Sequence, residues 1–283
     1  LKIANSLWLE KGIQFKDSFV TNAAKNFYAS SYNVDFEDTK TAKLMSKWIS
    51  DNTNGILSPD FKLDKEQIMS IINTIYFRDE WTDRFDANDT KPDTFYLNDG
   101  NKVKCDFMNS TYVSHGFKKG QGFTSSAIGL KNSGEMIFIL PDKGVSVDEL
   151  LSSAESISSL FDDKGLKNGK VIFKIPKFSF GSDLNLVDTL KVMGISSAFQ
   201  RDANFKGITD GTAFISNIRQ QTHIAIDEKG VEAAAYTSIN YAGSALAKDE
   251  VAEMILNRPF IFAIKSNNGA LLFIGVVNNP AEK

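Results

Sequence analysis

The chain has 283 residues, 42% of them hydrophobic, and a formal net charge of −3, a composition typical of a globular protein with a large apolar core. Charges of both signs are mixed along it, so no nucleic acid and no anionic membrane surface is expected as a partner. No apolar run reaches the length of a membrane span.

The first part of the chain predicts a strand followed by two helices. Residues 3–10, which read IANSLWLE, predict a buried strand, and residues 16–30 and 41–55 carry apolar residues at helical spacing. One face of the second helix is predicted to carry its large apolar side chains, Leu44, Trp48 and Ile49. Asn54-Gly55 is a typical end for this helix.

A strand and a hairpin are predicted next. Residues 67–77 are almost continuously apolar, and the two strands within 93–109 flank Asn98-Asp99-Gly100, which is a hairpin signature. Cys105 is the only cysteine, so no internal disulfide is possible. Because it alternates in phase with Val103 and Phe107, its thiol is predicted to be buried and inert.

Strands dominate the second half of the chain. One amphipathic helix is predicted over 147–161 and another over 184–199, closing near Gly194. Strands are predicted at 135–142, 171–180, 222–228, 258–265 and 270–277. This mixture indicates one α+β domain with large sheets over residues 1–283.

No catalytic site is predicted. His115, expected in a turn, and His223, in the polar phase of a strand, are the only histidines, and no GxSxG motif positions a serine beside either. Metal-ligand spacing and a glycine-rich phosphate loop are both absent. A hydrolase is therefore disfavoured, no cofactor or metal is expected, and the function is sought in an interaction.

One long polar segment is unusual because it lacks proline. Residues 230–250 are rich in Ala, Ser and Gly, as in an exposed loop, yet the nearest downstream proline is Pro259. Proline has no N–H to donate to a sheet, so a segment that must become a central strand excludes it. The Ala-rich start of the segment also fits a helical turn, since alanine is the best helix former.

Several motifs together resemble the serpin family of serine protease inhibitors. They cover nearly the whole chain and read EKGVEAAAYTS at 228–238, INTIYFRDEW within 72–100, IPKFSF at 175–180, MGISSAF at 193–199, ANFKGI at 203–208 and NRPFIFAIK within 257–280. The resemblance implies a serpin fold with a large mixed main β-sheet, further sheets, packed helices and an exposed reactive-centre loop at about residues 228–256.

The resemblance also implies a mechanism and the residues that serve it. The target serine protease cleaves the loop as bait, and the acyl-enzyme is trapped when the loop inserts into the main sheet. The implied hinge residues are Glu228, Lys229, Gly230, Val231, Glu232, Ala233, Ala234 and Ala235. The implied sheet-opening region contains Asn73, Trp81 and Gln220, where Gln220 replaces a histidine found in many members. An amide at 220 can still hydrogen-bond to the amide at 73.

Alternation within the hinge agrees with a segment that becomes a strand. Side chains of a strand alternate between its faces. One face carries Val231, Ala233, Ala235, Thr237 and Ile239, which are mostly small and apolar. The other carries Glu232, Ala234, Tyr236, Ser238 and Asn240, which suit solvent better. Gly230 provides backbone freedom at the pivot.

The family spacing from Glu228 places the bait bond at Ser244–Ala245. A small residue there suits an elastase-like or subtilisin-like protease. The segment from Ser244 to Arg258 looks longer than usual, so three other bonds remain open: Tyr241–Ala242, Leu246–Ala247 and Lys248–Asp249.

Two further expectations follow from the resemblance. The family's first helices have no counterpart before Leu1, so the N-terminal part is expected to be absent, and a missing segment is a candidate partner. Secretion or a cell-surface location is expected for such an inhibitor. The alternative is a non-inhibitory serpin acting as a carrier, chaperone or storage protein, although such members tend to have bulky, charged or proline residues in the hinge.

Overall fold

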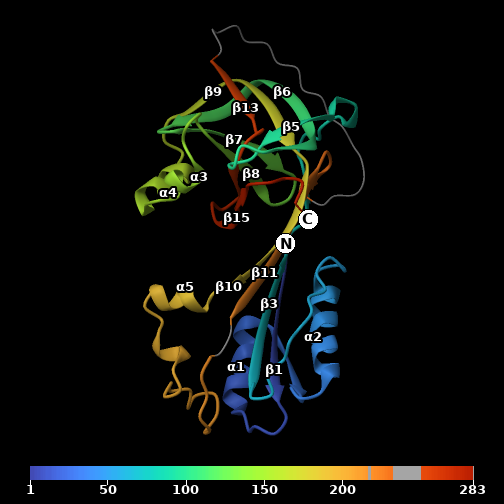
Figure 1. Ribbon diagram of the computed structural model, residues 1–283, viewed down its shortest axis with the longest axis vertical. Coiled ribbons are helices and arrows are strands. Elements are labelled where there is room, and N and C mark those ends of the chain that lie inside the picture. Colours follow the sequence, from blue (N-terminus) through green and yellow to red (C-terminus); the bar gives the residue numbers. More distant parts are fainter. Residues whose placement is uncertain (216–217, 232–249, 283) are drawn as a thin grey trace. The chain divides into compact units, whose positions relative to one another are not determined.

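The computed structural model describes residues 1–215, 218–231 and 250–282, which form two compact units (Figure 1). The first unit consists of Leu1–Phe77 and Gly181–His223, and the second of Arg78–Phe180 and Ile224–Lys283. Strands β10 (Phe178–Asn185) and β11 (Arg219–Asp227) contribute residues to both units. Within the described residues, no helix is both long and apolar enough to cross a membrane.

The first unit is a sheet with a helix on each face (Figure 1). Its strands lie in the order β2 (Ala29–Val34), β1 (Lys2–Glu10), β3 (Met69–Tyr76) and the start of β11. Helix α1 (Asp17–Phe27) packs on the face that carries Leu7 and Leu9, and α2 (Thr39–Asn52) packs on the face of Trp8. The short helices α5 (Val187–Val192) and η2 (Ser197–Phe199) belong to the same unit.

Helix α2 begins close to where the sequence predicted but presents a different face. Asp38 caps it by accepting a hydrogen bond from the Lys40 N–H, and Met45 and Ile49 are each only 1% exposed. Leu44, predicted on the buried face, is 54% exposed. Positions 45 and 49 are one helical turn apart, whereas position 44 is rotated by about 100° from 45. The prediction for Leu44 was therefore wrong.

The second unit is built on a larger sheet. Its strand order is β13 (Val251–Ile255), β9 (Leu166–Pro176), β6 (Lys102–Gly120), β7 (Phe123–Leu130), β8 (Gly134–Pro141), β14 (Phe260–Ser266) and β15 (Leu271–Val277), with β5 (Lys91–Tyr96) also paired to β6. Strand β14 lies between β8 and β15, and four of its side chains are completely buried: Phe260, Ile261, Ala263 and Ile264.

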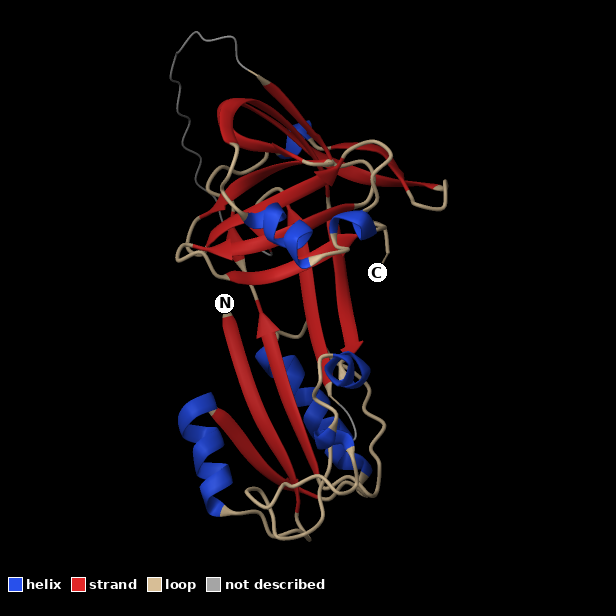
Figure 2. Cartoon of the chain, turned by 90° about the vertical axis from the view of Figure 1, so that its left-hand side faces the viewer, coloured by secondary structure: helices blue, strands red, loops and turns tan. Residues whose placement is uncertain are grey.

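The single helix predicted over 147–161 is two helices. Figure 2 shows short helices, drawn in blue, lying against the strands in the upper part of the picture. Helix α3 (Val147–Leu150) and helix α4 (Ala154–Phe161) are separated by Leu151–Ser153. The Ser153 hydroxyl accepts a hydrogen bond from the Ser156 N–H at 3.1 Å and so starts a new helix. Serine competes with the helical backbone in this way, which a periodicity argument does not detect.

The hairpin around Asn98-Asp99-Gly100 is confirmed, with Tyr96 paired to Lys102. Cys105 lies in β6 opposite Asp93 and is half-buried. Burial, together with the neighbouring Asp106 and Asp93 carboxylates, raises the pKa of its thiol to about 11. The thiolate is therefore scarce at neutral pH, consistent with an inert thiol.

His115 lies inside β6 and not in a turn. The register of β6 against β9 shifts between Tyr112 and His115, so a strand irregularity occurs where the polar SHGF sequence predicted a turn. The His115 ring is 2.7 Å from the Ala127 carbonyl oxygen and packs against Tyr112 and Phe173.

Candidate functional site: the hinge

The hinge begins with a two-residue strand, β12 (Gly230–Val231), that lies between β11 and β4 (Asp79–Glu80). Val231 pairs with Ile226 on one side and with Asp79 on the other, both antiparallel. Its side chain is only 1% exposed. The first apolar residue of the predicted hinge is thus part of a sheet, with its side chain buried.

Gly230 is required by the close approach of two backbones. Its φ is +152°, and a Cβ atom built there would lie 2.4 Å from the Asp79 carbonyl oxygen and 2.6 Å from Glu80 Cα. Such distances to backbone atoms exclude any side chain unless the strands separate. Glycine at 230 therefore permits β12 to pair with β4, a more specific role than general flexibility.

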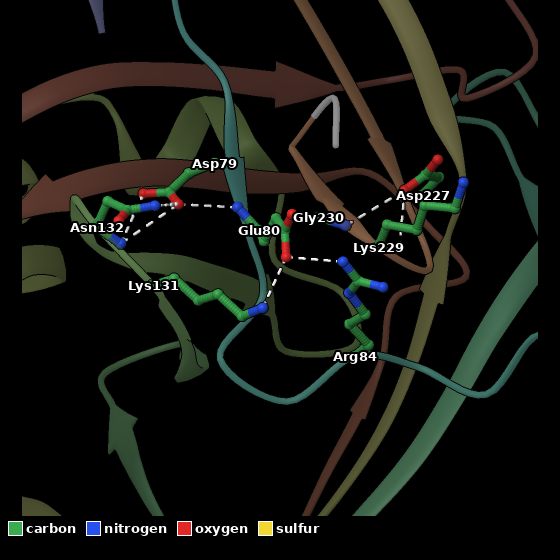
Figure 3. Close-up of polar contacts among 8 residues, drawn as sticks. All are labelled: Asp79, Glu80, Arg84, Lys131, Asn132, Asp227, Lys229 and Gly230. Atoms are coloured by element: carbon green, nitrogen blue, oxygen red, sulfur yellow. Dashed lines mark hydrogen bonds and ion pairs between the residues drawn. The ribbon is translucent and has the colours of Figure 1, made fainter. Parts of the chain in front are cut away.

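The turn that leads into β12 is held by the Asp227 carboxylate and by a segment after β4. Asp227 Oδ1 accepts hydrogen bonds from the N–H groups of Lys229, at 2.8 Å, and Gly230, at 3.2 Å (Figure 3). The Lys229 carbonyl accepts from the Trp81 N–H and the Glu228 carbonyl from the Phe85 N–H, each at 3.0 Å. The polar backbone groups of the turn thus largely have hydrogen-bond partners when β12 is paired in the sheet.

The Glu228 side chain joins the hinge to two other segments. Thr90, just after the 3₁₀ helix η1 (Ala87–Asp89), donates its hydroxyl to Glu228 Oε1 at 2.8 Å, and the Lys177 ammonium lies 3.0 Å from Oε2. Burial alone would raise the pKa of this carboxyl. Hydrogen bonds from its own backbone N–H and from Thr90 and Lys177 outweigh burial, so the pKa is lowered. Glu228 is therefore ionised at neutral pH.

Trp81 is the apolar anchor of the site. It is 0% exposed, and its ring centroid lies 6.1 Å from that of Phe85 and 6.4 Å from that of Phe138. Its indole N–H donates to the Asp227 carbonyl at 2.8 Å. One side chain thus packs into the core and binds the end of β11.

Strand β4 is held on its other side by the turn between β7 and β8. The Asp79 carboxylate, 3% exposed, accepts from the Asn132 N–H at 3.1 Å and from its side-chain amide at 2.9 Å (Figure 3). Glu80 lies 2.7 Å from both Lys131 and Arg84, and these hydrogen bonds, that from Lys131 first, lower the pKa of its carboxyl.

Five of the residues implied by resemblance lie together in this site: Trp81, Glu228, Lys229, Gly230 and Val231. Asn73 and Gln220 belong to the first unit. The Asn73 side-chain amide donates to Asn5 Oδ1 on β1 at 2.7 Å, and Gln220 is half-buried near the start of β11.

The rest of the predicted hinge and the bait bond lie outside the described residues, namely Glu232, Ala233, Ala234, Ala235, Ser244 and Ala245. The predicted loop of about residues 228–256 contains β12 near its start and β13 near its end. Strand β13 pairs in parallel with β9, with Ala252 and Met254 buried, since its VAEMI sequence alternates as a half-buried strand does.

Sequence reasoning missed the residues that support the hinge: Asp79, Thr90, Asn132, Lys177 and Asp227. In the sequence, their polar and charged side chains resemble ordinary surface groups. The one available signal was that Asp79 and Glu80 lie between a long apolar run, which ends at Phe77, and a tryptophan. Among the described residues, no group of three or more His, Cys, Asp or Glu is placed to hold a metal ion.

Comparison with known proteins agrees with this architecture. A family profile described as Serpin (serine protease inhibitor) matches residues 1–280, so the chain belongs to the serpin family. A serine protease inhibitor of the mouse, Mus musculus, is 31% identical over 99% of this chain and 68% of that protein.

Two solved structures share the serpin fold. The thermophilic serpin tengpin in its native state has a TM-score of 0.86 and 29% identity, over 98% of this chain and 73% of that one. Human thyroxine-binding globulin, complexed with its hormone, has a TM-score of 0.85 at 24% identity, over 99% of this chain and 75% of that one, a likeness of fold alone.

Proposed function

We propose that the chain inhibits serine proteases by a suicide mechanism. The protease serine attacks the carbonyl of Ser244, the bond to Ala245 breaks, and the Ala245 amine leaves with a proton. The resulting ester is trapped when the loop inserts as a strand before water hydrolyses it. Non-inhibitory members share the fold, so the proposal rests on the hinge and not on the fold.

The observation that carries the proposal is the position of Val231. It is buried between two strands, and each of them pairs with β12 in register. A loop that continued from Val231 in the same direction would extend the existing strand β12. Insertion would therefore not have to start a new strand. The small residues that follow at 233 and 235 fit the same buried face.

The decisive experiment is a denaturing gel of the protein mixed separately with elastase-like, trypsin-like and chymotrypsin-like serine proteases. An SDS-stable band at the summed mass is expected with the elastase-like enzyme, because Ser244 fits a shallow primary pocket. Cleavage without a stable band for every protease would contradict the proposal and favour a carrier or storage function.

Target preference is expected to follow position 244. The Ser244→Arg variant should shift complex formation from elastase-like to trypsin-like proteases, because an acidic primary pocket selects a basic side chain. Mass spectrometry of the C-terminal fragment after denaturation identifies the bond. Consistent cleavage at another bond, such as Lys248–Asp249, would show that the spacing from Glu228 misplaces the bait.

A further inference from the structure

We propose that Asp79 is a positioning residue for the hinge: through Asn132 in the β7–β8 turn, it fixes β4 as the edge on which β12 pairs. This deepens the proposed function and rests on it as far as protease trapping is concerned. The pairing of β12 with β4 can be measured independently of any protease.

The Asp79 carboxylate is buried and held by N–H donors. The Asn132 backbone and side chain supply two donors, and the Glu80 N–H supplies a third at 2.8 Å. The nearby cations Lys131 and Arg84 are engaged by Glu80. A buried carboxylate that loses such donors carries a large desolvation cost, so removal of the Asn132 contacts should displace Asp79.

Displacement of Asp79 would act directly on the hinge. Asp79 is the register partner of Val231. If residue 230 had a Cβ atom, the Asp79 carbonyl oxygen would be the backbone atom closest to it. The two backbones approach so closely that a small movement of β4 changes whether β12 pairs with it. Sheet pairing is register-specific, so the edge cannot move without releasing the hinge.

The β7–β8 turn therefore becomes a control point for loop entry, even though it contributes no residue to the hinge. Asn132 is exposed, and Lys131 in the same turn binds Glu80. The backbone of this turn also holds β4, because the Lys131 N–H donates to the Glu80 carbonyl at 2.9 Å. A change in this turn should alter hinge pairing without touching the bait bond.

The test compares Asn132→Asp with Ser133→Asp, which adds the same charge one residue further along. At pH 8 the new carboxylate at 132 faces Asp79 and repels it, whereas at about pH 5 the pair can share one proton and re-form a hydrogen bond. The other charged groups nearby are Glu80 on β4, with Arg84 and Lys131 bound to it, whereas Asp227 lies on the far side of β12. Asp79→Asn, which keeps shape and one acceptor, is the conservative variant.

Hydrogen exchange of the peptide containing Gly230 and Val231 is measured against wild type at the same pH. We expect exchange at least about tenfold faster in Asn132→Asp at pH 8, recovery toward wild type at low pH, a smaller effect in Asp79→Asn and none in Ser133→Asp. Three outcomes would overturn the inference. They are equal exchange in all variants, equal acceleration in both aspartate variants, and acceleration in Asn132→Asp that does not recover at low pH.

Complex formation with the protease is measured in parallel. A reduced yield of stable complex only in Asn132→Asp at pH 8 would link hinge pairing to trapping. If exchange responds as expected but even wild type forms no complex, the proposed function fails while the role of Asp79 in hinge pairing stands.

Discussion

Replacing Val231 with arginine is expected to turn the proposed inhibitor into a substrate that the protease cleaves without being trapped. Val231 is 1% exposed between β11 and β4, so the variant must either bury an unpaired charge or keep β12 out of the sheet. Burial of an ion costs several kcal/mol. In the proposed mechanism, insertion competes with hydrolysis of the acyl-enzyme, and each ~1.4 kcal/mol added to the insertion barrier slows insertion about tenfold. Hydrolysis should therefore win.

The measurement is the stoichiometry of inhibition, meaning the number of inhibitor molecules consumed per protease trapped. We expect it to rise by on the order of tenfold or more in Val231→Arg, with cleavage at the same bond. Glu232→Arg is the matched control, because alternation places residue 232 on the opposite face of a strand. Equal effects at 231 and 232 would refute the interpretation of the hinge as a strand.

The second large effect is expected at Trp81. Trp81→Ala should destabilise the second unit by about 3 to 5 kcal/mol, because it removes a large, fully buried side chain. The readout is the denaturant midpoint by circular dichroism. The cavity would open beside Phe85 and Phe138, while the Asp227 carbonyl would lose the indole donor.

Trp81→Phe separates packing from hydrogen bonding. It retains an aromatic ring but not the indole N–H, so the loss attributable to the hydrogen bond is about 1 kcal/mol, with a further packing loss for the smaller ring. The order alanine, phenylalanine, wild type in increasing stability is expected. A midpoint unchanged in Trp81→Ala would mean that this tryptophan does not hold the end of β11.

Much of the fold could be predicted because local pattern and tertiary packing agree. The apolar run that becomes β14 is buried in the middle of a sheet, and the Asn98-Asp99-Gly100 turn needs only its own residues to form. The end of α2 was also readable, since Asn54 and Gly55 both have positive φ.

The remaining features depend on contacts that sequence does not encode locally. Ser152 and Ser153 interrupt the helical spacing of apolar residues over 147–161, so one predicted helix becomes α3 and α4. In α2, only tertiary packing decides which face is buried. The position of Asp79 beside an apolar run and a tryptophan does not predict its donors, because two of the three come from Asn132, far along the chain. For the same reason, family motifs indicate where a hinge is expected but not which residues hold the segment that leads into it.

The placement of β13 and β14 determines whether the two fragments of a cleaved molecule would stay associated. The proposed bait bond, Ser244–Ala245, falls between β12 and β13 in the sequence, so a cut there would leave β13, β14 and β15 on the shorter fragment. That fragment includes a strand enclosed by β8 and β15 with side chains buried in the core, and β13 stays paired to β9. Cleavage would thus produce a nicked, two-chain protein that stays assembled until it is denatured.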